Sequence, residues 1–78
     1  MLNEIIEKYE DSVFLKADGF DKAVIGVETQ SMNLIYSVKA CVKILCKDMS
    51  YDESIDFFYF NVKGSYMGKH TPIWCEDI

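Results

Sequence analysis

The stretch MSYDESIDFFYFNVKG, residues 49–64, decides the fold of this chain. Ser50 and Glu53 have the spacing of a capping box, in which the serine oxygen accepts a backbone N–H of the first helical turn and the glutamate reaches back to the cap. At the other end, Gly64 suits a left-handed helix terminus. We therefore predict a helix over residues 51–63.

This helix carries more apolar side chains than one packing face needs. A stripe at helical spacing suffices to dock it on a sheet and consists of Ile55, Phe58 and Val62. Phe57 and Phe60 point elsewhere, so they are covered either by a second layer of the protein or by another chain. The segment containing Tyr66 and Trp74, which turns back toward the sheet, is a candidate for that layer.

The start of the helix is acidic, which suits the helix dipole. We assign partner binding to the surplus aromatic and acidic side chains, namely Asp52, Glu53, Asp56, Phe57, Phe60 and Tyr66. Together with a helix expected over residues 38–47, the helix resembles a helix-turn-helix pair. Its acidic residues would be repelled by DNA phosphates, so direct DNA reading is disfavoured.

Composition points to a small acidic globule. The chain has 78 residues, 50% of them hydrophobic, and a net charge of −5 with eight lysines and no arginine. We expect a single domain over residues 1–78. The absence of arginine argues against nucleic-acid binding, and the acidity favours either simple solubility or a basic partner. No apolar stretch reaches the length of a membrane span and the N-terminus does not resemble a signal peptide, so we expect a cytoplasmic protein.

The remaining pattern predicts an α+β fold. We expect a short N-terminal helix, a tight turn at Asp18–Gly19, and short strands over residues 12–17, 23–28, 32–36 and from about 71. The three-residue break between the second and third of these strands predicts an antiparallel hairpin, and Gly26 predicts a bulge within it. Ser37 is a natural N-cap for the helix over residues 38–47. The expected architecture is a small antiparallel sheet of three to four strands, with the two-helix hairpin on one face and the N-terminal helix at the edge.

Three lysines recur every fourth residue along the helix over residues 38–47, at Lys39, Lys43 and Lys47. Such a run is usually the solvated side of a helix, where it complements the negative end of the dipole. A basic binding face is the alternative.

The residues with chemical potential do not form a recognisable site. Cys41, Cys46 and Cys75 lack C-x-x-C spacing, and with His70 as the one histidine they make no zinc motif. Asp18 and the residues after it lack the closing glutamate of a calcium loop. We therefore expect no catalytic residue, no metal and no cofactor.

Two segments resemble a known family. Residues 18–27, DGFDKAVIGV, and residues 49–74, MSYDESIDFFYFNVKGSYMGKHTPIW, are similar to a family of short uncharacterised proteins encoded by bacteriophages and some bacteria. The family pattern reads D-G-F-D-x-A-hydrophobic-x-G-V, then M-S-Y-x-E-A-hydrophobic-x-F-F-x-F-N-V-x-G. Ser54 stands where alanine is usual, and Ser37 where an aspartate often caps the middle helix. The resemblance implies a phage or prokaryotic cytoplasmic origin and supplies no activity, cofactor or catalytic residue.

These observations favour a small non-enzymatic protein that acts by protein–protein binding. The leading interpretation is a phage-encoded modulator or inhibitor of a host enzyme or defence system, in the style of anti-CRISPR proteins, whose partner has a basic nucleic-acid-binding groove. The alternative is a homo-oligomeric structural or assembly protein without an external target, which leaves a homodimer open. A small enzyme is disfavoured because no nucleophile–base pair, phosphate loop or metal cluster is recognisable.

Overall fold

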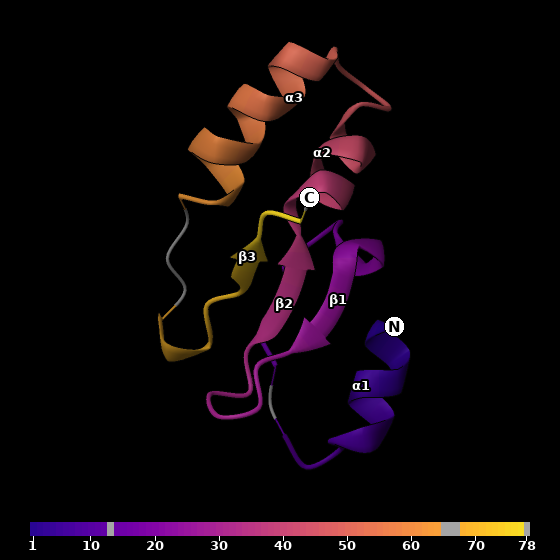
Figure 1. Cartoon of the computed structure of the whole chain (residues 1–78), viewed down its shortest axis with the longest axis vertical. Helices are drawn as coiled ribbons and strands as arrows, with labels where there is room; N and C mark the ends of the chain where they lie inside the picture. The colour runs from indigo at the N-terminus through magenta and orange to yellow at the C-terminus, as the bar shows by residue number, and fades with distance from the viewer. Residues whose placement is uncertain (13, 65–67, 78) are drawn as a thin grey trace.

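A computed structural model describes residues 1–12, 14–64 and 68–77, and shows an α+β arrangement around a three-stranded sheet (Figure 1). The elements in chain order are α1 (Leu2–Lys8), the 3₁₀ turn η1 (Asp21–Ala23), β1 (Val24–Val27), β2 (Leu34–Ser37), α2 (Val38–Leu45), α3 (Tyr51–Phe57), the π-helical segment η2 (Phe58–Val62), the 3₁₀ turn η3 (Gly68–His70) and β3 (Ile73–Cys75). Tyr66, one of the residues predicted to bind a partner, lies outside the described residues.

The hairpin between β1 and β2 confirms the antiparallel pairing expected from the short break in the sequence. Val24 pairs with Tyr36 and Gly26 with Ile35, so Ile25 is the extra residue of a β-bulge next to the glycine, as predicted. The hairpin loop closes on Met32, whose φ of 61° lies in the left-handed region. The Glu28 carboxylate holds the loop by accepting from the backbone N–H and the hydroxyl of Ser31, each at 2.6 Å.

The third strand corrects the expectation of an all-antiparallel sheet. β2 is the central strand, and β3 pairs with it in parallel, Tyr36 opposite Trp74. The reason is the long connection: α2 and α3 carry the chain away from the end of β2 and back to its beginning before β3 starts (Figure 1). A parallel partner requires such a crossover, whereas a tight turn gives an antiparallel one.

No strand forms over the described part of residues 12–17, and this prediction was wrong; residue 13 lies outside the described residues. The segment instead runs as an irregular loop into the turn at Asp18–Gly19, where Gly19 has a φ of +87°. The backbone N–H of Ala17 donates to the Tyr36 hydroxyl at 2.8 Å. A side chain of the central strand thus satisfies a backbone group that a sheet ladder would otherwise have satisfied.

The predicted helices form, with a different end for the last one. Ser37 and Ser50 cap α2 and α3 as expected, accepting from Ala40 N at 3.0 Å and from Glu53 N at 3.2 Å. Gly64, however, does not adopt the left-handed conformation, because the helix ends through the π-helical turn η2. A Cβ at Gly64 would lie 3.2 Å from the Phe60 carbonyl oxygen, so the glycine serves close approach instead.

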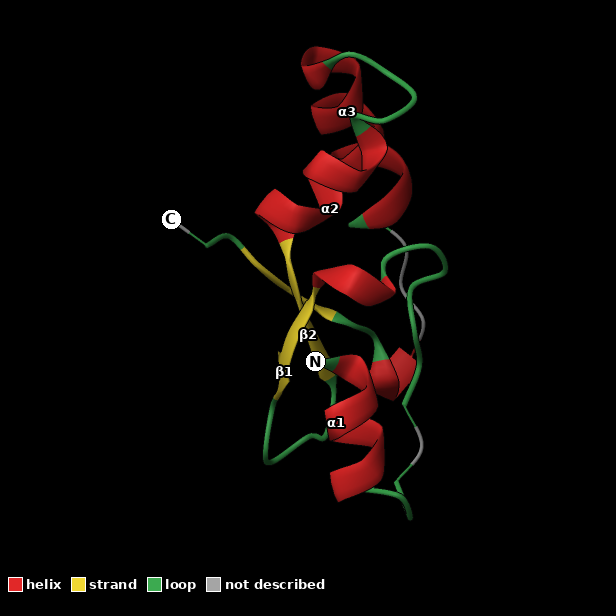
Figure 2. Ribbon diagram, turned by 90° about the vertical axis from the view of Figure 1, so that its right-hand side faces the viewer, coloured by secondary structure: helices red, strands yellow, loops and turns green. Residues whose placement is uncertain are grey.

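The helix pair extends the molecule beyond the sheet more than it covers a sheet face. α2 continues directly from β2, and α3 folds back beside α2 above the end of the strands (Figures 1 and 2). α1 lies next to β1 at the opposite end. The principal extents are 39 × 23 × 22 Å. Packing of the helix pair on one face of the sheet is therefore confirmed only directly after α3, where Phe58 packs against Trp74.

The core joins the sheet to both helices of the pair. Tyr36 and Phe58 are its largest fully buried side chains, each 0% exposed. The Trp74 ring bridges them, with ring centroids 5.2 Å from Tyr36 and 5.4 Å from Phe58. Val38, Cys41 and Val42 on α2 are buried against this centre.

Candidate functional site

The change from α- to π-helical geometry at Phe58 determines which aromatic side chains are free. The Lys63 N–H donates to the Phe58 carbonyl at 2.8 Å, an i to i+5 bond that widens the last turn. Phe58 is buried in the core, whereas Phe60, two residues later, is 82% exposed. Phe57, on the preceding turn, is 41% exposed. Trp74 therefore covers Phe58 and leaves both surplus phenylalanines at the surface.

These two phenylalanines lie beside the acidic residues of α3. An open hollow of about 470 Å³ is lined by Met49, Glu53, Asp56, Phe57, Phe60 and Asn61. We call Glu53, Asp56, Phe57 and Phe60 the α3 outer face. Four of the six residues predicted to bind a partner thus come together, and Asp52 is exposed one helical turn before Asp56.

The carboxylates of this region form no ion pair with another described residue. Among the described residues, the one ion pair is between the N-terminal ammonium and Glu4, 3.7 Å apart. Asp52, Glu53 and Asp56 all face solvent. Their negative charge interacts favourably with the positive end of the helix dipole. It is also available to an incoming basic group. On contact with another molecule, this region can bury its phenylalanine rings while its carboxylates pair with cations around them.

A second hollow lies on the other side of the helix pair, and the sequence did not predict it. It measures about 290 Å³ and is lined by Val38, Lys39, Val42, Tyr51, Ile55, Tyr59, Glu76 and Asp77. Asp77 closes one side by accepting from the Ser37 hydroxyl at 2.7 Å and from the Lys39 N–H at 3.3 Å. No local pattern could reveal this contact, because its partners are some forty residues apart in the sequence.

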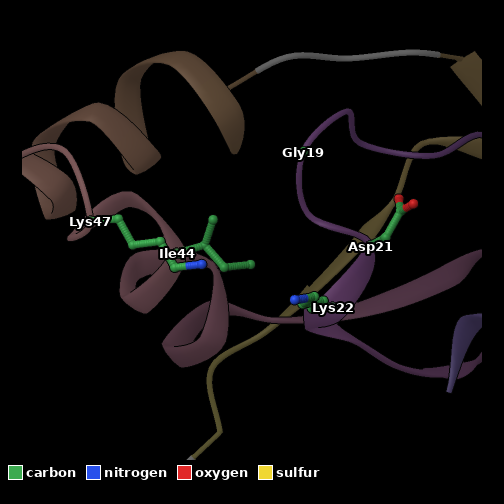
Figure 3. A pocket seen from close by; sticks show the side chains of 5 residues that line it. All are labelled: Gly19, Asp21, Lys22, Ile44 and Lys47. Atoms are coloured by element: carbon green, nitrogen blue, oxygen red, sulfur yellow. The ribbon is translucent and has the colours of Figure 1, made fainter.

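A third hollow lies between α2 and the segment around η1, which precedes β1 (Figure 3). It measures about 300 Å³ and is lined by Gly19, Asp21, Lys22, Ile44 and Lys47. Lys47 and Ile44 lie side by side on the α2 side, and Lys22 extends toward them while the Asp21 carboxylate points away. Of the three lysines that recur along the sequence, Lys47 lines this hollow; Lys22 was not part of that pattern.

The cysteines and the histidine lie apart from the α3 outer face. Cys41 is buried, and desolvation raises the pKa of its thiol to about 12. Cys46 is exposed and His70 lies at the surface in η3. Across the described part of the chain, no three His, Cys, Asp or Glu side chains gather in a way that could hold a metal ion. None of the described helices combines the length and the apolar character needed to cross a bilayer.

In comparisons with known proteins, no family model, no curated protein and no solved structure matches this chain. The α3 outer face is therefore interpreted from its own chemistry.

Proposed function

We propose that this chain is a non-enzymatic binding protein that uses the α3 outer face to occupy a basic groove on another protein. The observation that carries the proposal is Phe60, 82% exposed beside Phe57 and sharing a hollow with the exposed carboxylates of Glu53 and Asp56. Phe60 is the most exposed of the described aromatic side chains, and so large an apolar group is unfavourable to leave in water. Covering it on a partner stabilises the complex by about 1.5–3 kcal/mol.

The charges select the class of partner. Asp52, Glu53 and Asp56 flank the aromatic pair, so a complementary surface presents lysine or arginine around an apolar pocket. Grooves that bind nucleic acid have this character, because they are built to receive phosphates. The binding protein would then compete with nucleic acid for its target.

The proposal for the biological setting rests on the resemblance of residues 18–27 and 49–74 to short phage and bacterial proteins. We propose a modulator or inhibitor of a host enzyme or defence system, encoded by a phage and acting in the host cytoplasm. Occupation of a basic groove by a carboxylate-bearing helix would inhibit such a target without any chemistry.

Affinity capture from a nuclease-treated bacterial lysate tests the proposal. The wild type and Phe60→Ser are immobilised in parallel, with Ile25→Ser as a control that removes another exposed apolar side chain, 41% exposed, from a different element. We expect basic nucleic-acid-handling proteins on the wild type and on the control, lost from Phe60→Ser and displaced by added DNA. Equal retention by all three variants would show that the α3 outer face is not the binding site.

A further inference from the structure

We propose that the α3 outer face also binds the lysine side of α2 on a second copy of this chain, and that this self-association regulates access to the face. The inference uses the same face as the proposed function and adds a second surface, which the external target does not need. It therefore concerns the regulation of that face, and it rests on the proposed function only for the competition between copy and target.

The first argument is charge segregation between the two helices. α2 and the turn after it present Lys39, Lys43 and Lys47 to solvent, each about one helical turn from the next. α3 presents Asp52 and Asp56 with the same spacing. Lys43, Lys47, Asp52 and Asp56 form no ion pair among the described residues, whereas Lys39 lies near Asp77 and contributes to lowering the pKa of its carboxyl. The two rows are opposite in sign and equal in spacing, as a contact between helices of two copies requires.

The second argument is that the lysine side contains a receptor for an aromatic ring. The hollow of about 300 Å³ in Figure 3 is lined by half-buried Ile44 beside Lys47 on the α2 side, with Lys22 across from them. Phe60 of a second copy, seated there, would contact Ile44 and lie between two cations. An ammonium group over the face of an aromatic ring makes a favourable cation–π interaction. Asp56, one turn before Phe60, would then face Lys47.

The expected complex is weak and sensitive to salt. One helix face against another buries less than about 1,200 Å² in total, which is typical of transient complexes. Its exposed ion pairs lose strength as the Debye length shortens from about 10 Å at 0.1 M salt to about 3 Å at 1 M. A target with a deeper apolar pocket would displace the second copy, so the aromatic face stays covered until the target is present.

Charge-swap sedimentation tests this self-association. One variant reverses the acidic row, Asp52→Lys with Asp56→Lys, and a second reverses the basic row, Lys43→Glu with Lys47→Glu. Each variant places like charges opposite one another in a self-complex, so we expect at least about tenfold weaker self-association than in the wild type. An equimolar mixture of the two restores opposite charges across the contact and should restore association to within a few-fold. Circular dichroism verifies that both variants are folded.

A matched control separates the contact from general repulsion. Lys8→Glu with Asn3→Asp and Gln30→Asp gives the same net charge as the α2 variant, and these exposed residues lie on α1 or in the β1–β2 hairpin loop, away from α2 and α3. We expect this control to associate like the wild type at equal salt. The proposal is overturned if the wild type sediments as a monomer up to about 0.5 mM at low salt, if the α2 variant associates like the control, or if mixing the two folded swap variants restores nothing.

The outcome is distinguishable from that of the proposed function. Lys43→Glu with Lys47→Glu leaves the α3 outer face intact, so in the lysate capture it should retain the same proteins as the wild type, whereas Phe60→Ser should lose both target and self-association. Capture without charge-swap rescue overturns the regulation alone. Charge-swap rescue without capture leaves a self-associating chain and overturns the external target.

Discussion

Phe58 and Phe60 are two residues apart and have opposite surroundings, 0% and 82% exposed. We expect Phe58→Ala to lower the free energy of unfolding by about 3–5 kcal/mol, because it leaves a cavity against Tyr36 and Trp74. Phe60→Ala should change it by less than about 0.5 kcal/mol. Urea denaturation followed by circular dichroism measures both. A large loss for Phe60→Ala would mean that this ring is part of the core and not of a binding face.

Ser54 illustrates a cost that the fold tolerates. Its side chain is 0% exposed, and its hydroxyl has no hydrogen-bond partner among the described residues. Removing an unsatisfied buried hydroxyl from a helix interior should stabilise, and alanine is also the better helix former. We expect Ser54→Ala to raise the free energy of unfolding by about 0.5–2 kcal/mol. Ser50→Ala is the contrasting variant, because losing this N-cap should lower it by about 1 kcal/mol. A destabilised Ser54→Ala would show that the hydroxyl is satisfied in solution.

At the scale of elements, the start of α2 is held by the acidic residue Asp77 after β3. The hydrogen bond from Ser37 is the main cause that lowers the pKa of this carboxyl below its ordinary value of 3.8, with the Lys39 N–H adding to it. A lowered folded-state pKa stabilises the protein above the unfolded value, and this stabilisation is lost as the pH falls through the folded value. We therefore expect Asp77→Asn to be less stable than the wild type at neutral pH, with the difference vanishing in acid below 3.8.

Chemical denaturation at neutral and acidic pH measures this difference. Glu28, whose pKa is also lowered by its bonds to Ser31, gives the wild type and the variant the same additional acid dependence. A stability difference that persisted unchanged in acid would mean that the charge of the Asp77 carboxylate does not help to hold the start of α2.

Elements defined by neighbouring residues were predictable from the sequence, and those defined by distant ones were not. Ser37 and Ser50 cap their helices as local signals require, and the β1–β2 hairpin follows from its short connection. The direction of β3 depends on the path of the whole crossover. Residues 14–17 have strand composition but find no ladder, because Tyr36 takes the Ala17 N–H. Helical counting placed Phe60 off the docking stripe, but it did not predict the π-helical turn that begins at Phe58.

At the scale of the whole molecule, acidic and basic side chains are sorted onto different helices. Both rows are visible in the sequence. From it we interpreted the lysine row chiefly as a solvated face and the acidic row as a binding face. Only the folded chain shows that Lys22 lies across a hollow from Lys47 and Ile44. This juxtaposition comes from tertiary contact between η1 and α2, whose residues are about twenty positions apart.

The strand register also fixes how the sheet responds to mechanical force. Val24, where β1 begins, pairs with Tyr36, and Cys75, where β3 ends, pairs with Ser37, so both edge strands can be gripped at the same end of β2. Pulling residues 24 and 75 apart opens the ladders one bond at a time, like a zipper. Tethers at residues 27 and 75 instead load opposite ends of the sheet, so that the bonds share the load in shear. Optical-tweezer experiments should record a lower rupture force for the first pair of tethers, and equal forces would contradict the register.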